Sequence, residues 1–243
     1  MKYKMTFDFH THTTFSHGKG SIEDNVREAV RKGLRAIAIT DHGPGHLTYG
    51  IKRSAVAEMR AEIDRLKPLY PEIEIYLGVE ANTIDKDNYL DVTKEEYSQY
   101  DFVNAGYHFG VTHGYCIANF LFRHGIMKTE KRKEFLSKRN TQMIINAIEN
   151  NKIKILTHPG DKAPVNMAEI AKACAKNNVL MEISTHHSHL TVEEIKIAAR
   201  EDVKFIISSD AHNPERVGDF QGGLDRAIEA GLDLKRIVNI EEV

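Results

Sequence analysis

Cysteine is scarce in this chain, with only Cys116 and Cys174 among 243 residues. The two lie far apart and form no CxxC pair, which argues against a disulfide framework and against a thiolate metal site. The sequence has no run of about 18 apolar residues, and its first stretch, "MKYKMTFDFH", has no apolar signal-peptide core. We therefore expect a cytoplasmic protein without a membrane span.

The chain also lacks an excess of charge of either sign. Lys and Arg total 33 against 35 Asp and Glu, so the formal net charge is -2. No broad positive field would draw a long nucleic acid or an anionic membrane to the surface. Any anionic partner must then be recognised locally.

Internal repeats, low-complexity tracts and linker-like shifts in composition are missing from the sequence, and we expect one domain over residues 1–243. Short β-branched runs alternate with amphipathic segments, which is typical of βα units around parallel strands. The fold class is α/β, at the size of one barrel. Seven strands are predicted, at 3–9, 36–40, 74–79, 101–106, 153–157, 179–184 and 204–209.

Helix signals fill the intervals between these strands. Ser21 with Asp24, and Thr191 with Glu194, have the spacing of capping boxes ahead of apolar stripes. Residues 109–138 are mixed in character, so no element is assigned to them.

Histidine, by contrast, is abundant, with 13 residues. In "DFHTHTTFSHG", residues 8–18, the HTH spacing directs His10 and His12 the same way because alternate strand residues share a face. Further histidines and acids follow the other predicted strands, at the end where barrel enzymes keep their chemistry. The full set is His10, His12, His17, His42, Glu80, His108, His158, Asp210 and His212.

Each of these residues taken alone is more often a helix cap, a surface side chain or a satisfied core group. Together they would place many desolvated polar groups at one end of the barrel, which costs free energy unless a ligand binds them. Neutral imidazole and carboxylate without thiolate suit zinc, manganese or iron, and so many donors exceed what one ion takes. We therefore expect two or three metal ions.

The ordered motifs "HTH", "SHG", "TDHGP", "GVEAN", "GYH", "THPGD" and "SDAH" resemble the PHP (polymerase and histidinol phosphatase) superfamily over nearly the whole chain. The chain looks most like its small stand-alone phosphatases of the YcdX type. This resemblance implies a distorted seven-stranded (β/α) barrel with three divalent metal ions at the C-terminal ends of the strands. The ions would usually be Zn2+, with Mn2+ or Fe2+ as alternatives.

The resemblance also distributes the ligands. It assigns His10, His12, Glu80 and Asp210 to the first ion, Glu80, His108 and His158 to the second, and His17, His42 and His212 to the third. The interval from His12 to His17 is one residue shorter than in the YcdX type.

Other polar residues near these motifs receive supporting roles. Asp8 and Asp41 are expected to orient ligand imidazoles through the other ring nitrogen, or else to make hydrogen bonds at strand ends and loops. Lys19, Arg53 and Arg216 occur in loops after strands and are candidates for contact with a phosphorylated substrate. Side chains of this kind are more often solvated surface charges.

The cluster "THHSH" follows the sixth predicted strand. Its histidines, His186, His187 and His189, are expected to line the pocket and are not counted as ligands.

These features predict hydrolysis of a small phosphate monoester by a metal-bound hydroxide at a trinuclear site. The sequence contains no GxSxG elbow and no P-loop pattern, and no residue identifies itself as the acid for the leaving group. Two alternatives stay open. One is a PHP-type phosphodiesterase or exonuclease acting on short nucleotides, and the other is a non-catalytic metal-binding module.

Overall fold

Seven parallel strands form the centre of the protein, in a computed structural model that describes residues 2–126 and 128–243. The strands pair in chain order, so each is joined to the next by a crossover. They are β2 (Phe7–Asp8), β3 (Ala36–Ile39), β4 (Glu74–Asn82), β5 (Phe102–Gly106), β6 (Ile153–Leu156), β7 (Leu180–Ser184) and β8 (Phe205–Ser208). The predicted α/β class and the distorted seven-stranded barrel are confirmed.

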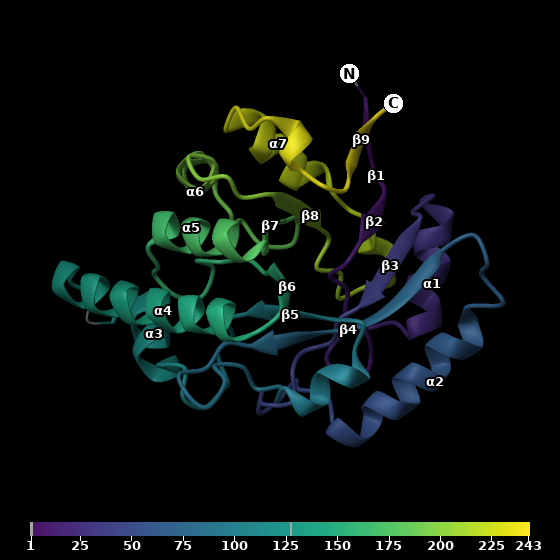
Figure 1. Ribbon diagram of the computed structural model, residues 1–243, viewed down its shortest axis with the longest axis horizontal. Coiled ribbons are helices and arrows are strands. Elements are labelled where there is room, and N and C mark those ends of the chain that lie inside the picture. Colours follow the sequence, from purple (N-terminus) through teal and green to yellow (C-terminus); the bar gives the residue numbers. More distant parts are fainter. Residues whose placement is uncertain (1, 127) are drawn as a thin grey trace.

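Helices surround these strands (Figure 1). They are α1 (Ile22–Arg31), α2 (Val56–Leu66), α3 (Cys116–Arg123), α4 (Glu130–Asn150), α5 (Met167–Asn177), α6 (Val192–Ala198) and α7 (Gln221–Glu229), with 3-10 turns η1 (Arg53–Ala55), η2 (Glu95–Gln99), η3 (Pro214–Arg216) and η4 (Leu234–Arg236). The predicted capping boxes start α1 and α6. The unassigned residues 109–138 contain α3 and the start of α4. No helix in the described part of the chain is long and apolar enough to cross a bilayer.

The seam between β2 and β8 is bridged by a side chain instead of a strand ladder. Asn239 is fully buried there. Its Nδ2 donates to the carbonyl oxygens of Phe7 (2.9 Å) and Ile207 (2.7 Å), and its Oδ1 accepts from the Ile207 N–H (3.1 Å). Farther along the seam the His12 N–H donates to the Ala211 carbonyl at 2.8 Å. These bonds nearly close the barrel directly below the site.

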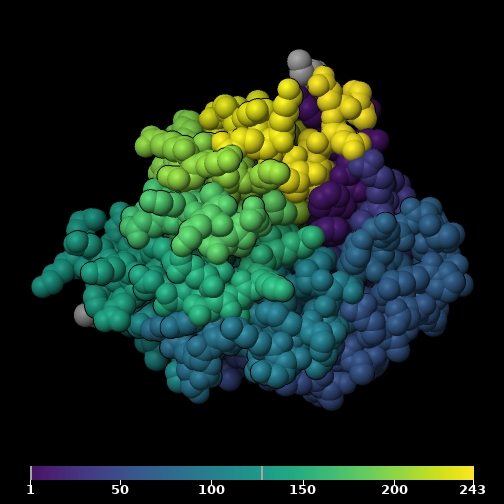
Figure 2. All heavy atoms as spheres, in the orientation of Figure 1, coloured from purple at the N-terminus to yellow at the C-terminus, as the bar shows by residue number. Residues whose placement is uncertain are grey.

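The predicted first strand, 3–9, is two strands. β1 (Tyr3–Met5) pairs antiparallel with β9 (Ile240–Glu242), and only β2 enters the barrel. Between them Thr6 donates its N–H (2.9 Å) and its hydroxyl (3.1 Å) to the Asn239 carbonyl. In Figure 2 the yellow C-terminal segment packs beside the purple N-terminal one. Both chain ends are therefore anchored next to the seam.

Two apolar layers hold the barrel. The outer layer lies between the strands and the helices and includes Ile63 of α2 and Leu77 of β4, both fully buried. The inner layer is smaller and consists of Phe9, Ala36, Ala38, Ile155 and Ile206. Because alternate residues of a strand face opposite ways, the strands from β3 to β8 contribute to both layers. Burying each large side chain stabilises the fold by about 1.5–3 kcal/mol.

Candidate metal centre

Glu80, near the end of β4, stands at the centre of the site. Its carboxylate is fully buried and lies 2.9 Å from His42 Nδ1, 2.9 Å from His158 Nε2 and 3.3 Å from His10 Nε2. His108 Nε2 is 3.5 Å away, and His12 Nε2 is the fifth, at 3.7 Å. The predicted strand stops before Glu80, whereas β4 continues past it and pairs there with β5. The carboxylate is therefore carried by a rigid backbone and has five imidazoles around it.

The packing around Glu80 depends on a glycine. Thr157, just after β6, donates its hydroxyl to Glu80 Oε1 at 2.6 Å. A Cβ atom on Gly106, at the end of β5, would lie 2.3 Å from Thr157 Oγ1 and 2.8 Å from Glu80 Oε1. Glycine therefore leaves the room that this close approach requires.

Asp210, just after β8, is the second buried carboxylate. Its Oδ1 lies 3.2 Å from His12 Nε2 and 3.6 Å from His10 Nε2, and its Oδ2 lies 3.2 Å from His187 Nε2. Asp210 and His158 both have positive φ, 50° and 28°. Residues other than glycine adopt this conformation rarely, and it persists where the surrounding structure imposes it. Here it turns two polar side chains into the site.

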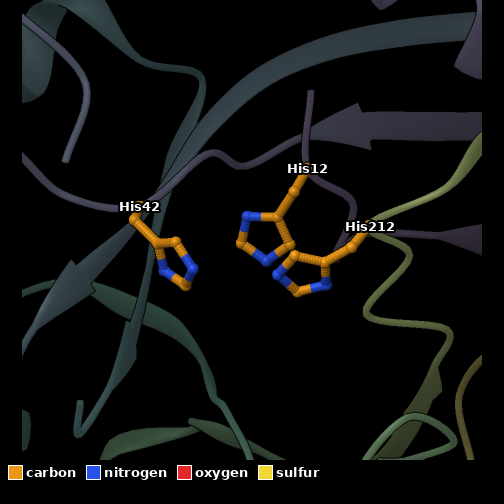
Figure 3. A group of neighbouring side chains, drawn as sticks. All are labelled: His12, His42 and His212. Atoms are coloured by element: carbon orange, nitrogen blue, oxygen red, sulfur yellow. The ribbon is translucent and has the colours of Figure 1, made fainter. Parts of the chain in front are cut away.

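His12, His42 and His212 come from separate segments of the chain and point into a common space (Figure 3). The ring centroid of His12 lies 4.2 Å from that of His212 and 4.3 Å from that of His42. His17 lies beside them at the exposed rim, 4.2 Å from His212 between ring centroids and 4.8 Å from His42. The residues predicted as ligands are thus brought together at one end of the barrel.

Five sets of three side chains place their ligand atoms within 4.8 Å of one another. The sets are His12–His42–His212, His10–Glu80–His158, His10–His12–Asp210, His42–Glu80–His108 and His158–His187–Asp210. Every predicted ligand except His17 belongs to at least one set found among the described residues. One member, His187, was not predicted as a ligand.

Burial and neighbouring charges divide the imidazoles into two classes. Burial holds the pKa of His12 and the pKa of His108 well below the usual range. Burial also opposes the charged form of His10, but the carboxylates of Glu182 and Glu80 outweigh it and raise the pKa of His10. The first class presents neutral rings with free lone pairs, and the second must release protons before it can bind a metal ion.

Several buried nitrogen and oxygen atoms that could ligate a metal ion make no hydrogen bond of acceptable angle. They are His12 Nδ1, His42 Nδ1, Glu80 Oε2 and Asp210 Oδ2, although His42 Nδ1 and Glu80 Oε2 lie 2.9 Å apart. Each unsatisfied group costs about 1–3 kcal/mol, and more when it is charged. Imidazole nitrogen and carboxylate oxygen are ligands of zinc, manganese and iron. The residues present therefore fit divalent metal ions.

Two residues that were not predicted to belong to the site orient the imidazoles. Glu182, fully buried in β7, accepts from His10 Nδ1 (2.6 Å) and from the His158 N–H (2.7 Å). Asn82 Oδ1 accepts from His108 Nδ1 at 2.8 Å. Metal-ligating histidines are commonly held in this way, with one ring nitrogen donating and the other left for the ion. The available signal for Glu182 was a charged residue inside the apolar run "VLMEIS".

The hydrogen bonds of Asp8 and Asp41 hold loops and not imidazoles, which corrects the orienting role expected of them. Asp8 accepts from the Gly218 N–H at 2.8 Å. Asp41 accepts from the N–H (2.7 Å) and the hydroxyl (2.6 Å) of Thr13, and from the Ser16 hydroxyl (2.5 Å). Because these loops carry ligands, both carboxylates still shape the site.

A cavity of about 300 Å³ opens above the donors. Besides site histidines and Asp210, its lining contains His46, Tyr49, Phe109, Lys162, His186 and His187. Lys162 was not predicted as a site residue, and its Nζ lies 2.5 Å from Asp161 Oδ2. A larger hollow of about 660 Å³ lies at the opposite end of the barrel, around Phe7 and Lys154, away from the polar cluster.

The three predicted substrate-binding cations lie in different surroundings. Arg216 lies behind the cavity lining, with its Nη1 3.2 Å from Nδ1 of the lining residue His186. Arg53 instead lies 2.5 Å from Glu96 and holds a surface loop. Lys19 is exposed, and its N–H donates to the His212 carbonyl at 2.9 Å. Of the three, Arg216 is the one whose side chain contacts a residue of the cavity lining.

Known proteins share the sequence pattern and the fold. The family described as PHP domain matches residues 8–186. A "probable phosphatase" of Thermoanaerobacter sp. strain X514 is 31% identical over 98% of this chain and 91% of its own length. Another from Acetivibrio thermocellus is 29% identical over 97% and 91%. The crystal structure of histidinol phosphate phosphatase from Lactococcus lactis, complexed with zinc, L-histidinol and phosphate, has a TM-score of 0.61 at 16% identity, covering 94% of each chain.

Proposed function

The chain belongs to the PHP domain family, and from that premise we propose that it is a metal-dependent phosphoric ester hydrolase acting on a small phosphate monoester. The observation that carries the proposal is the group of buried donor atoms without hydrogen-bond partners below the cavity. Such a cluster is costly without a cation and serves catalysis when the cation is present.

The overlapping donor sets support more than one ion, and three divalent ions are proposed, with zinc as the first choice. As the family resemblance implies, one ion would be held by His10, His12, Glu80 and Asp210, a second by Glu80, His108 and His158, and a third by His17, His42 and His212; of these groupings, His10, His12 and Asp210 also occur together as a donor set. Such ions, when bound, make water a competent nucleophile near neutral pH and neutralise charge on a phosphoryl group. Glu80 would contribute to two of these positions.

The chain itself supplies the positioning of the substrate. Lys162 lines the cavity and Arg216 lies behind His186 of the lining, and their positive charges would attract a phosphate dianion toward the ligands. Tyr49 and Phe109 give the cavity an apolar wall for the rest of the substrate. A volume of about 300 Å³ is the size of a site for a small molecule.

The named relatives support this substrate class. The curated relatives carry the name "probable phosphatase", and the Lactococcus lactis structure holds phosphate beside a small amino alcohol. Both point to monoester hydrolysis without selecting one substrate for this chain.

A substrate panel tests the proposal. Metal-free protein would be reloaded with zinc, manganese or iron and assayed against phosphomonoesters, phosphodiesters and short oligonucleotides. We expect hydrolysis of monoesters. We also expect Glu80→Gln, which keeps the side-chain volume, to lower kcat/KM at least about 1000-fold, or about 4 kcal/mol of transition-state stabilisation.

The matched control is Glu74→Gln, an exposed glutamate at the start of the same strand, which should leave kcat/KM unchanged. A preference for diesters or oligonucleotides would replace the proposal with a phosphodiesterase. Metal-loaded protein that cleaves no substrate of the panel would favour a metal-binding module.

A further inference from the structure

His187 lies in the loop between β7 and α6 and faces two of the proposed ligands. Its Nε2 is 3.2 Å from Asp210 Oδ2, and its ring centroid is 4.8 Å from that of His158. The three side chains offer ligand atoms that all lie within 4.8 Å of one another. The position therefore meets the same geometric condition as the sets formed by the predicted ligands.

The other ring nitrogen of His187 lies near an oxygen acceptor. Nδ1 is 3.3 Å from Asp161 Oδ2. This repeats the arrangement at His10, whose Nδ1 donates to Glu182 while its Nε2 faces the site. A histidine that binds a metal ion commonly donates the N–H of one ring nitrogen to a carboxylate, while its other ring nitrogen faces the ion.

The loop that carries His187 is fixed at several points. The His187 N–H donates to Ser184 Oγ at 3.1 Å. From α7, Arg226 donates to the carbonyls of Leu190 (2.9 Å) and His187 (3.3 Å), and also to the Ser184 carbonyl. The side chain therefore starts from a held backbone, as a ligand site requires.

An ion pair with Asp161 does not by itself account for the placement of His187. Asp161 already has Lys162 Nζ at 2.5 Å and Arg123 Nη1 at 3.6 Å. On the opposite side of the ring lies Asp210 Oδ2, which is buried, has no hydrogen-bond partner and has no lysine or arginine of the described residues within 4 Å, whereas Asp161 Oδ2 lacks a hydrogen bond but has the ammonium of Lys162 beside it. The carboxylate oxygen that lacks a cation is therefore inside the site, where Nε2 of His187 faces it.

We propose that His187 is a metal ligand, a tenth donor that completes a position shared with His158 and Asp210. The inference rests on the proposed function and deepens it. His187 faces both Asp210, which is assigned to the first ion position, and His158, which is assigned to the second. It also makes Asp161 the positioning residue behind this ligand.

Zinc titration of metal-free protein against a chromophoric chelator, with bound metal measured by mass spectrometry, tests this assignment independently of activity. For His187→Ala we expect one ion to bind at least about 100-fold more weakly, since loss of an outer partner alone costs about 10–100-fold. Asp161→Asn should weaken the same ion by about 10–100-fold. The matched control is His186→Ala, in the same loop, whose Nδ1 faces Arg216, and it should titrate like wild type.

The possible results distinguish failure of the ligand role of His187 from failure of the proposed metal-dependent function. If wild type and His187→Ala bind every ion equally, His187 is not a ligand while the proposed function stands. The same holds if His187→Ala loses activity but keeps all its ions, because the histidine would then serve the substrate. If wild type binds no ion, both the inference and the metal-dependent function fall. Should His187→Ala not fold by circular dichroism, Asp161→Asn decides the question, and unchanged affinity there would overturn the proposal.

Discussion

Replacing Glu182 by glutamine should weaken metal binding although Glu182 belongs to none of the donor sets found in the described chain. The carboxylate accepts two hydrogen bonds, one on each oxygen, from His10 Nδ1 at 2.6 Å and from the His158 N–H at 2.7 Å. A glutamine has the same size but only one acceptor oxygen. Glu182→Gln therefore cannot satisfy both donors.

Both orientations of the new amide are unfavourable. If its oxygen stays on the His158 N–H, its NH2 faces His10 Nδ1, and the ring proton must move to Nε2, the atom that faces Glu80 at 3.3 Å. That proton would occupy the ligand lone pair. If the oxygen turns to His10, the His158 N–H is left buried against another donor, at a cost of about 1–3 kcal/mol. Either way we expect a zinc affinity about 10–100-fold lower, or about 1.4–2.7 kcal/mol.

Competition titration with zinc measures this loss directly. The control is Glu194→Gln, because Glu194 pairs with His189 Nδ1 at 3.0 Å outside the donor cluster. This variant should lose some stability, as Glu194 also caps α6, but no metal affinity. A folded Glu182→Gln protein that binds each ion as tightly as wild type would refute the tautomer argument.

Two further predictions concern stability. Removing metal with a chelator should lower Tm by about 8–16 °C for each ion whose free concentration is about 1000 times its Kd. Such an ion contributes about 4 kcal/mol to the free energy of unfolding, and 1 kcal/mol corresponds to about 2–4 °C in a chain of this size. An unchanged Tm after verified removal would contradict metal binding to the native state. Burial raises the pKa of Asp91 to about 6 from 3.8, against hydrogen bonds from Asn82 and Gly45 that lower it. A folded-state pKa above the unfolded value stabilises the protein fully below pH 3.8, and this stabilisation is lost as the pH rises through about 6. When the pH is lowered from 8 to 5, the free energy of unfolding of metal-free wild type, measured with urea, should therefore rise by about 1.4 kcal/mol relative to that of Asp91→Asn. If the two proteins gave parallel pH profiles, the raised pKa would be ruled out.

The strands and the donors at their ends follow from local signals in the sequence. Apolar runs such as "KFIISS" are read directly as buried strands, and parallel pairing then brings the residues after them to one end. The seam could not be predicted in this way. It depends on Asn239, a polar residue more than 230 positions from Phe7, whose amide substitutes for a strand ladder. Nothing local in the sequence distinguishes this asparagine from a surface one.

The orienting residues were missed for a different reason. Glu182 follows three apolar residues in the predicted strand 179–184, which therefore reads as a buried strand. Asn82 lies beyond the predicted strand 74–79, two residues after Glu80 at the end of β4, so no strand pattern marked it. Asp8 and Asp41, which do stand at strand ends, proved to bind loops. A carboxylate's partner is set by which groups the tertiary fold brings within 3 Å or so, and spacing along the chain does not contain that information.

The strand faces show how the apolar run and the polar site coexist. On β4, Tyr76 and Glu80 share a face because they are an even number of residues apart; Tyr76 packs on the inner apolar layer, and Glu80 stands in the site. Ile206 of β8 and Asp210 beyond it repeat this order. Both strands thus place an apolar side chain beneath a polar one. The lower layer excludes water from below the carboxylates, and low dielectric strengthens their attraction for cations. Metal affinity therefore depends on the packing of the barrel as well as on the ligands.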